Sequence, residues 1–197
     1  MNNSNMSIID SKILREKIKD NSIRIVDVRR EQDYQLGHIT NAVNLPLAKL
    51  LADDSAESIQ KIAQDLGISD ETFVVIYDDT FGALSSRVVW ALQYIGHRDA
   101  KLLDVTFSQW KTLGYEISTE VPEIESAAHS IKENKDIMAT AEYLEKVKEN
   151  KNVIIIDNRE RLNYLEQHIP GAINIPYRTL ATDGKILRTK EGMKNLL

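Results

Sequence analysis

Short apolar runs alternate with helical patterns along the first part of the chain. The clearest example spans residues 73–96, where the apolar run 73–77 is followed by a polar turn around Gly82. From residue 83 onward, apolar side chains recur at helical spacing. The pattern predicts a buried strand, a tight loop and an amphipathic helix. In an open α/β sheet a binding site usually forms at such a junction, where free N–H groups and the helix dipole face an anion.

The same alternation extends over residues 7–113. Pro46, Ser55 and several glycines stand where helices are expected to begin or end, as these residue types favour. We expect strands at 7–9, 23–26, 42–45, 73–77 and 101–103. We expect helices at 12–19, 31–36, 55–66, 83–96 and 106–113, and one more that begins at Pro46. Strands and helices of this size in alternation predict an α/β fold, a parallel sheet with helices on both faces.

Residues 116–134 have a different character. They surround Pro122 with acidic and polar residues and contain few large apolar groups. We interpret 122–135 as a linker that wraps the first domain. The alternation then starts again. The pattern predicts a strand at 136–138, a helix at 142–149 capped by Thr140, and a buried strand at 153–156.

The second run repeats the first at a constant offset of 130 residues. Eight identities keep this register: Asp27 and Asp157, Arg29 and Arg159, Tyr34 and Tyr164, His38 and His168, Ile39 and Ile169, Ala42 and Ala172, Asn44 and Asn174, Pro46 and Pro176. An unbroken register of this kind indicates an internal repeat of a whole domain. We predict a complete domain at 7–121, the linker at 122–135 and the first half of a second copy at 136–197.

The half-copy prediction follows from the register, because adding 130 to Phe73 gives 203, a position beyond the 197 residues. We therefore expect the second copy to be truncated before the strand, loop and helix of residues 73–96. A partial parallel sheet exposes a strand edge and part of its core. Self-association through this incomplete domain is a possible consequence.

The composition of the chain argues against several classes of function. The net charge is −5 and no dense basic run occurs, which argues against nucleic-acid binding. No apolar run approaches the length of a membrane span, and residues 1–5 lack the pattern of a signal peptide. We therefore expect a cytoplasmic protein without a membrane partner. The chain contains no cysteine, so it offers neither disulfides nor thiolate chemistry of its own.

Several motifs together resemble the rhodanese family. Asp-x-Arg at a strand end is followed by Gly-His-Ile and then by Ala-x-Asn-x-Pro, at residues 27–29, 37–39 and 42–46. The second copy carries the related run 168–176. Residues 77–79, 87–90 and 103–110 also look like the N-terminal domain of tandem rhodaneses. The resemblance covers nearly the whole chain, and the motifs occur in order, twice.

The resemblance implies a thiosulfate or 3-mercaptopyruvate sulfurtransferase without cofactor or metal, which acts on small sulfur-containing anions. In this family a cysteine thiolate accepts a sulfane sulfur as a persulfide and passes it to a thiophilic acceptor. In tandem members the C-terminal domain carries that cysteine. Asp78 stands at the cysteine position of the first domain, and the second-domain cysteine is expected beyond Leu197. The alternative is a non-catalytic rhodanese-like module for binding or regulation.

The repeated polar residues have two readings. Asp27, Arg29, Asp157 and Arg159 could hold an anion through arginine, but residues at strand ends more often tie loops together, and we favour that role. His38 and His168 could act as general bases. Because they stand in a repeated turn without a matching nucleophile, we interpret them as hydrogen-bonding turn residues.

Substrate-binding residues are less defined by the sequence. Some family members have an arginine directly before the tyrosine of the second copy, where this chain has Asn163. Arg159 and Arg161 are nearby and are the candidates for substrate binding. The choice of substrate is therefore open at the level of sequence.

The sequence offers two further kinds of candidate nucleophile, aspartate and serine. The sequence Asp78-Asp79-Thr80 shares features with phosphatases that use an aspartyl nucleophile and Mg²⁺. In those phosphatases the aspartates are separated by another residue, whereas Asp78 and Asp79 are adjacent and would face opposite ways on an extended chain. A turn that caps the next helix is the simpler interpretation. Ser85 and Ser86 lack a Gly-x-Ser-x-Gly elbow, so we do not assign them a catalytic role.

Overall fold

A computed structural model describes residues 8–18, 23–182 and 184–194. The chain divides into two compact units, residues 1–135 and residues 136–197. Each unit is described by itself. The predicted strand residue Ser7 and the predicted helix end Lys19 lie outside the described residues. Within the described residues, no helix is long and apolar enough to cross a membrane.

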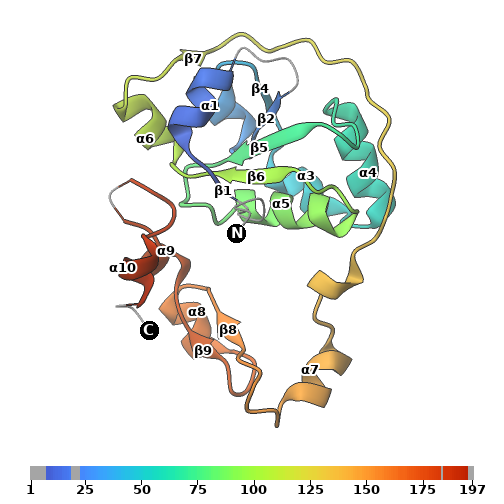
Figure 1. The fold of residues 1–197 in the computed structure, drawn as a ribbon, viewed down its shortest axis with the longest axis vertical. Helices are drawn as coiled ribbons and strands as arrows, with labels where there is room; N and C mark the ends of the chain where they lie inside the picture. Colours follow the sequence, from blue (N-terminus) through green and yellow to red (C-terminus); the bar gives the residue numbers. More distant parts are fainter. Residues whose placement is uncertain (1–7, 19–22, 183, 195–197) are drawn as a thin grey trace. The chain divides into compact units, whose positions relative to one another are not determined.

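Unit 1 is built on a five-stranded sheet with the strand order β1-β6-β5-β2-β4 (Figure 1). Its strands are β1 (Ile8–Ile9), β2 (Ile23–Asp27), β4 (Ala42–Asn44), β5 (Phe73–Tyr77) and β6 (Ala100–Leu103). Every pair in this sheet is parallel. In the central pair Asp27 lies opposite Tyr77, and on the other side Asp27 lies opposite Asn44. The predicted parallel α/β sheet is confirmed.

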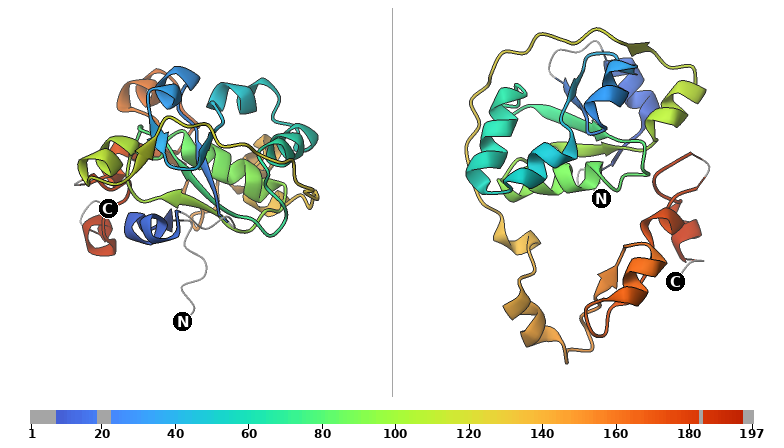
Figure 2. Two further views of the ribbon diagram at one scale, coloured as in Figure 1. Left: turned by 90° about the horizontal axis from the view of Figure 1, so that it is seen from above. Right: turned by 180° about the vertical axis from the view of Figure 1, so that it is seen from behind.

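Helices cover both faces of this sheet (Figure 2). One face packs against α3 (Leu47–Ala52), α4 (Ala56–Asp65) and α5 (Ser85–Tyr94). The other face packs against α1 (Ser11–Lys17), α2 (Glu31–Gln35) and α6 (Phe107–Thr112). Side chains that alternate along the strands serve the two cores in turn. Val74 and Ile76 enter the first core, whereas Val75 and Tyr77 enter the second.

Side-chain caps begin three of these helices. Asp10 accepts a hydrogen bond from the Lys12 amide at 2.7 Å and caps α1. Ser55 and Thr106 cap α4 and α6 in the same way. Such caps satisfy N–H groups that have no partner within the helix.

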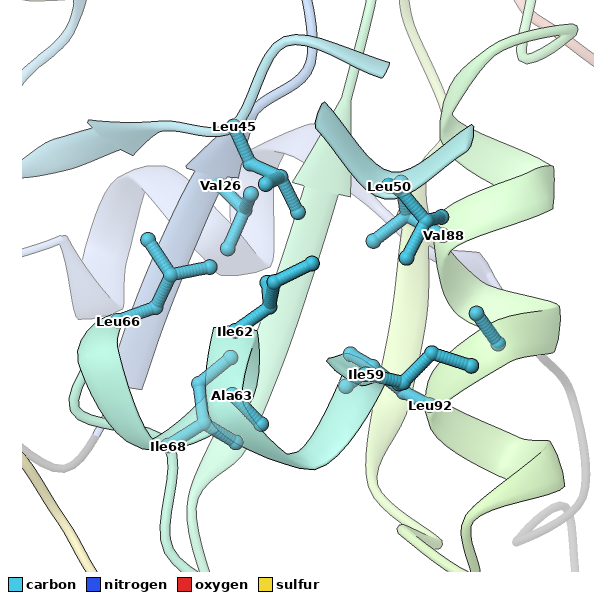
Figure 3. A pocket seen from close by; sticks show the side chains of 11 residues that line it. Val26, Leu45, Leu50, Ile59, Ile62, Ala63, Leu66, Ile68, Val88 and Leu92 are labelled. Carbon is cyan, nitrogen blue, oxygen red and sulfur yellow. The ribbon is translucent and has the colours of Figure 1, made fainter. Parts of the chain in front are cut away.

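A small cavity lies inside the first core between the sheet and helices α3, α4 and α5 (Figure 3). Its volume is about 10 Å³ and all of its lining side chains are apolar, among them Val26, Ile59 and Leu92. A space of this size holds at most one water, and water needs polar partners that this lining lacks. The cavity is therefore a packing defect rather than a ligand site.

After α6 the chain forms the short strand β7 (Ile117–Ser118), which pairs antiparallel with β3 (His38–Ile39). Residues 119–135, here named the strap, then run along the outside of unit 1 (Figure 1). Backbone N–H groups of the strap bind carbonyls at the ends of α4 and α5. These bonds are Ala127 N to Gln64 O, Lys132 N to Ile95 O and Asn134 N to Tyr94 O.

Unit 2 contains the 3₁₀ helix η1 (Lys135–Ile137), which begins at the last residue of unit 1, and two short parallel strands. The strands are β8 (Ile156–Asp157) and β9 (Ile173–Asn174), and the helices are α7 (Ala141–Val147), α8 (Arg161–Glu166), α9 (Tyr177–Leu180) and α10 (Lys190–Lys194). Thr140 caps α7 as predicted, accepting from the Tyr143 amide at 3.2 Å.

Two predictions for unit 2 are wrong. Residues 136–138 do not form a strand, because no neighbouring strand pairs with them among the described residues and the 3₁₀ turn supplies local hydrogen bonds instead. Residues 153–156 are not a buried strand. Only Ile156 of this run belongs to β8, and Ile154 is 70% exposed. In the described part of the sheet β8 pairs on one side only, whereas its counterpart β2 lies between two strands.

The tight approach of the strap to Gly96 predicts a strong effect of Gly96→Ala. Gly96 has a φ of +96°, and a Cβ there would lie 2.6 Å from the Lys132 carbonyl. We expect a loss of about 2–4 kcal/mol of unfolding free energy, from left-handed strain and overpacking together. Gly114→Ala is the control, because Gly114 has a φ of +70° with nothing within 4 Å of its Cβ. Equal urea midpoints for the two variants would contradict a close-packed strap.

Candidate functional site

The candidate site lies at the carboxyl ends of β2 and β5, at the centre of the unit 1 sheet. After β2 the chain adds β4 on one side, and it later returns to place β5 on the other side. Such a switch in direction leaves a crevice at the strand ends, where open α/β sheets bind ligands. Asp27 ends β2, and Asp78 follows directly after β5. The two carboxylates of the site thus come from neighbouring strands.

The loop after β5 wraps around the side chain of Asp78. The Asp78 carboxylate accepts hydrogen bonds from the backbone N–H groups of Thr80, Gly82, Leu84 and Ser85, at 2.8–2.9 Å. A fifth bond comes from the Ser85 hydroxyl at 3.0 Å. Asp78 is 2% exposed. Residues 78–85 therefore form a cradle of N–H donors at the start of α5, and the carboxylate of the chain itself fills it.

This arrangement favours negative charge at one point. Four N–H groups converge, and the N-terminal end of α5 adds the positive end of its dipole. The loop reaches this shape through left-handed backbone at Phe81 and Gly82, whose φ angles are +57° and +85°. A cradle of this kind could hold an anionic nucleophile as well as a carboxylate.

The geometry gives no support to an aspartyl phosphatase. The Asp78 carboxylate is occupied by five donors, and Asp79 accepts from the backbone and hydroxyl of Ser108, at 2.8 and 2.6 Å. Both side chains therefore cap or close local structure. Ser85 donates to Asp78 and Ser86 donates to the Ala83 carbonyl, so both hydroxyls are used in bonds within residues 78–86.

Asp27 and Arg29 form a buried ion pair beside this cradle. Arg29 Nε lies 3.0 Å from each carboxylate oxygen of Asp27, and Arg29 Nη2 donates to the Gly37 carbonyl at 2.8 Å. The Tyr77 hydroxyl donates to Asp27 at 2.6 Å. The Arg29 guanidinium also lies 3.8 Å from the centre of the Phe107 ring. Neither the bond of Tyr77 to Asp27 nor the contact of Phe107 with Arg29 was predicted from the sequence, where these residues stand far from their partners.

Burial and the ion pair shift the pKa values of nearby groups. Burial alone would lower the pKa of Arg29, but hydrogen bonding and attraction to Asp27 outweigh it, so the pKa is raised. Burial, and then the negative charge of Asp27, hold the pKa of Tyr77 well above its usual value. The same two causes raise the pKa of Tyr34 to about 12. Arg29 is therefore charged and both tyrosines are neutral at neutral pH.

His38 lies in a structural position. It is fully buried, its ring stacks on Tyr34 at 3.8 Å between centroids, and Nδ1 lies 2.9 Å from the Tyr34 carbonyl. Nε2 lies 3.0 Å from the carbonyl of Glu120, the second residue of the strap. Both ring nitrogens are thus used to tie segments together, a geometry that fits a turn residue better than a general base.

The second copy repeats these hydrogen bonds 130 positions later. Arg159 Nε lies 3.0 Å from each carboxylate oxygen of Asp157. The Tyr164 hydroxyl donates to the Ala172 carbonyl at 2.8 Å, the same distance as in the first copy. Asn174 donates to the carbonyls of Asp157 and Arg159, as its counterpart does in unit 1. The repeat seen in the sequence is therefore a repeat of the hydrogen-bond network.

The two copies differ in their surroundings. The side chains of Arg29 and Asp27 are 10% and 0% exposed, whereas those of Arg159 and Asp157 are 51% and 11% exposed. Hydrogen bonds from Arg159 lower the pKa of Asp157, as expected for an ion pair. His168 contacts the Tyr164 carbonyl at 2.8 Å and is exposed.

The candidate anion-binding residues of unit 2 are separated. Arg159 lines an open hollow together with His168 and Ile169, but its guanidinium already donates to Asp157 and to the Gln167 carbonyl. Arg161 lies at the start of α8, with its guanidinium over the Tyr164 ring. The described residues contain no group of three or more His, Cys, Asp or Glu that could hold a metal ion.

Comparison with known proteins identifies the family. The rhodanese-like domain family matches this chain twice, at residues 10–113 and 140–196. The chain belongs to this family, and its two matches are consistent with a tandem-domain architecture.

Similar proteins include a sulfur carrier protein of Thermus thermophilus, 26% identical over 220 residues that cover 96% of this chain and 76% of the relative. A probable 3-mercaptopyruvate sulfurtransferase of Schizosaccharomyces pombe is 32% identical over 157 residues, covering 71% of this chain and 51% of the relative. Rat thiosulfate sulfurtransferase is 23% identical over 222 residues, covering 95% and 75%. Among solved structures, a 3-mercaptopyruvate sulfotransferase of Escherichia coli matches with a TM-score of 0.86 at 21% identity, covering 97% of this chain and 82% of that chain.

Removing the charge of Asp27 should destabilise unit 1 strongly. Asp27→Asn leaves Arg29 as a buried cation without a counter-charge, and we expect a loss of about 3–5 kcal/mol in urea unfolding. Asp157→Asn removes the same bonds in the second copy, where water reaches the arginine, so we expect little change. Equal losses of unfolding free energy in the two variants would show that burial does not determine how much the Asp–Arg pair stabilises each unit.

Emptying the cradle should create a rescuable defect. Asp78→Ala leaves four N–H groups without their acceptor, and we expect a loss of about 1–3 kcal/mol of unfolding free energy. Formate should recover part of this loss by entering the cradle, which thermal melts with increasing formate would measure. Asp79→Ala is the control, because Asp79 lies outside the cradle. If formate raised the melting temperature of both variants equally, a specific anion cradle would be excluded.

Proposed function

We propose that this chain is the non-catalytic part of a rhodanese-type sulfurtransferase of the thiosulfate or 3-mercaptopyruvate class. Its substrates are small sulfur-containing anions, and the product is a sulfur atom carried as a cysteine persulfide. The names of the relatives, thiosulfate sulfurtransferase and 3-mercaptopyruvate sulfurtransferase, support the reaction class. The observation that carries the proposal is the cradle of four N–H groups at residues 78–85.

The cradle suits this chemistry because the reaction keeps a negative charge on sulfur. A cysteine thiolate attacks the outer sulfur of thiosulfate, the S–S bond of thiosulfate breaks, and sulfite leaves with the electron pair. The enzyme then carries a persulfide anion at the same point. Fixed N–H dipoles stabilise the thiolate before the step and the persulfide after it.

The cysteine itself must come from elsewhere than these 197 residues, which contain none. In unit 1 the Asp78 carboxylate accepts the hydrogen bonds of the cradle, and we propose that it stands at the position of the cysteine sulfur. We place the cysteine in the corresponding loop of the second copy, beyond residue 197, as the register of the repeat predicts. The first domain then contributes the fold and a cradle that is permanently filled by its own carboxylate.

Installing a thiol in the unit 1 cradle tests this reasoning directly. Asp78→Cys should give a thiol with a pKa below the ordinary value of about 8.5, because four N–H groups favour the thiolate. After incubation with thiosulfate, mass spectrometry should detect a gain of one sulfur atom. Asp79→Cys is the matched control, since its side chain points to Ser108 rather than into the cradle. Equal sulfur loading of the two variants would show that the cradle does not promote transfer of sulfur to the thiol.

Measurements on the protein purified from its natural source test the proposed activity of the whole enzyme. Purified from its natural source, it should have a mass above 22.4 kDa, one or more alkylatable thiols and thiosulfate:cyanide activity that alkylation abolishes. A mass near 22.4 kDa without activity would instead favour a binding or regulatory module. Activity in a pure 197-residue chain would contradict the proposed chemistry.

Location and assembly complete the proposal. We propose a cytoplasmic protein, and the finding that no described helix is long and apolar enough to cross a membrane agrees with this location. We also propose that the second unit can self-associate, since Ile154, Leu162 and Leu165 are 70%, 75% and 60% exposed. Sedimentation equilibrium over a range of concentrations measures this. A mass that stays monomeric at every concentration would reject self-association.

A further inference from the structure

Two histidine contacts hold the strap to unit 1, one near each end. Near the start, His38 Nε2 lies 3.0 Å from the Glu120 carbonyl. Further along, His129 of the strap packs against His97, which follows the C-terminal end of α5. The strap leads directly into unit 2 at residue 136. Its attachment therefore sets how much of the connection between the two units is free chain.

The second contact is a buried pair of imidazole rings. His129 Nε2 lies 3.2 Å from His97 Nδ1, and the ring centroids are 5.4 Å apart. His97 is 2% exposed and His129 is 5% exposed. The backbone around His129 is held as well, because Gln60 donates to its carbonyl at 2.6 Å and Ser130 donates twice to Asp70.

We propose that His97 and His129 form a pH-sensitive latch, which holds the C-terminal part of the strap on unit 1 at neutral pH and releases it in mild acid. Release would convert the strap from Glu123 to Lys135 into free tether that precedes unit 2. The freedom of the second unit would then depend on pH, while the fold of each unit stays the same.

The hydrogen bond between the His97 and His129 rings depends on their protonation state. A neutral imidazole has one N–H donor and one acceptor nitrogen, so two neutral rings can share one N–H···N bond. When both rings are protonated, two N–H donors face each other at this position and the bond is lost. Like charges at hydrogen-bonding distance in a buried site are also strongly unfavourable.

The surroundings set the direction of the effect. Burial lowers the pKa of both His97 and His129, and for His97 the charge of His129 lowers it further. The pKa of His97 is raised, to a smaller extent, by the backbone of Thr72 and by the charges of Asp99 and Asp70. On His129, Asp70 and the backbone of Ser130 also favour the charged form, but burial prevails.

Asp70 itself remains ionised in mild acid, because the Ser130 hydroxyl and backbone, and to a smaller degree Lys132 and His129, lower its pKa. Released rings have the ordinary pKa of about 6.5 and bind more protons than docked rings below that pH. Docking is therefore fully favoured above about pH 6.5 and weakens as the pH falls. The equilibrium constant for release rises by up to about tenfold per pH unit for each ring that gains a proton.

The contact at His38 does not involve this ring pair. Its two ring nitrogens lie against the carbonyl oxygens of Tyr34 and Glu120. β7 is held on β3 by backbone pairing, in which neither His97 nor His129 takes part. The proposed release therefore concerns the part of the strap that follows Glu120.

Residue-resolved hydrogen exchange of the 197-residue chain tests the latch. Between about pH 7.5 and 5.5, and after correction for intrinsic exchange rates, the amides of Ala127, Lys132 and Asn134 should lose about tenfold to a hundredfold of their protection. The amide of Ile117 in β7 should not change. Unaltered protection of the three strap amides while the rings of His97 and His129 titrate in NMR spectra would overturn the proposal.

Matched variants separate the latch from general loosening of the strap. His97→Gln with His129→Gln should lower protection at neutral pH and remove its pH dependence. Ser130→Ala should lower protection at both pH values and leave the dependence intact, because the ring pair remains. His168→Gln changes a histidine of unit 2 and should have no effect on the strap. A pH dependence that persists in the double variant would assign the effect to another group and refute the latch.

Discussion

The pairing of Asp27 with Arg29 is the interaction on which the carboxyl edge of the sheet depends. Asp27 ends β2, an inner strand of the sheet, and is fully buried, so its charge requires a partner inside the protein. Arg29 supplies that charge and also binds the Gly37 turn, while Tyr77 brings the neighbouring strand to the same carboxylate. One buried charge thus fixes two strand ends and the turn between them, and the cradle of Asp78 starts one residue beyond Tyr77.

The second copy separates what is local in this motif from what is not. Asp157 and Arg159 make the same bonds as the first pair although they are far more exposed. The bonds span two residues, so the chain forms them without help from distant segments. The burial that makes the first pair indispensable comes from Tyr77 and Phe107, which lie far along the sequence. The motif is local, but its energetic importance comes from the surrounding fold.

The filled cradle relates this unit to the sulfur chemistry of its family. A carboxylate and a thiolate require the same thing from a protein, which is several donors aimed at one negative atom. Residues 78–85 keep that arrangement and fill it with Asp78, so the loop retains its shape without an external anion. The self-filled loop stabilises the fold of a domain that contains no cysteine.

The sequence alone determined the alternation of strands and helices in unit 1, the helix caps at Ser55 and Thr140, and the repeat with its family motifs. These features rest on periodicity and on contacts a few residues apart, which a single sequence displays directly. The strands predicted from the sequence at 136–138 and at 153–156 are wrong. Apolar residues suggested strands there, but the described part of unit 2 offers few neighbouring segments that could pair with them or bury them.

Only the tertiary structure decided the contacts that build the site and anchor the strap. The bond from Tyr77 to Asp27 spans 50 residues, that from His129 to His97 spans 32, and that from His38 to Glu120 spans 82. No periodicity marks such partners, because they meet through the order of strands in the sheet and the path of the strap. Side chains that look ordinary in the sequence acquire their roles when folding places them in a common, water-excluded environment.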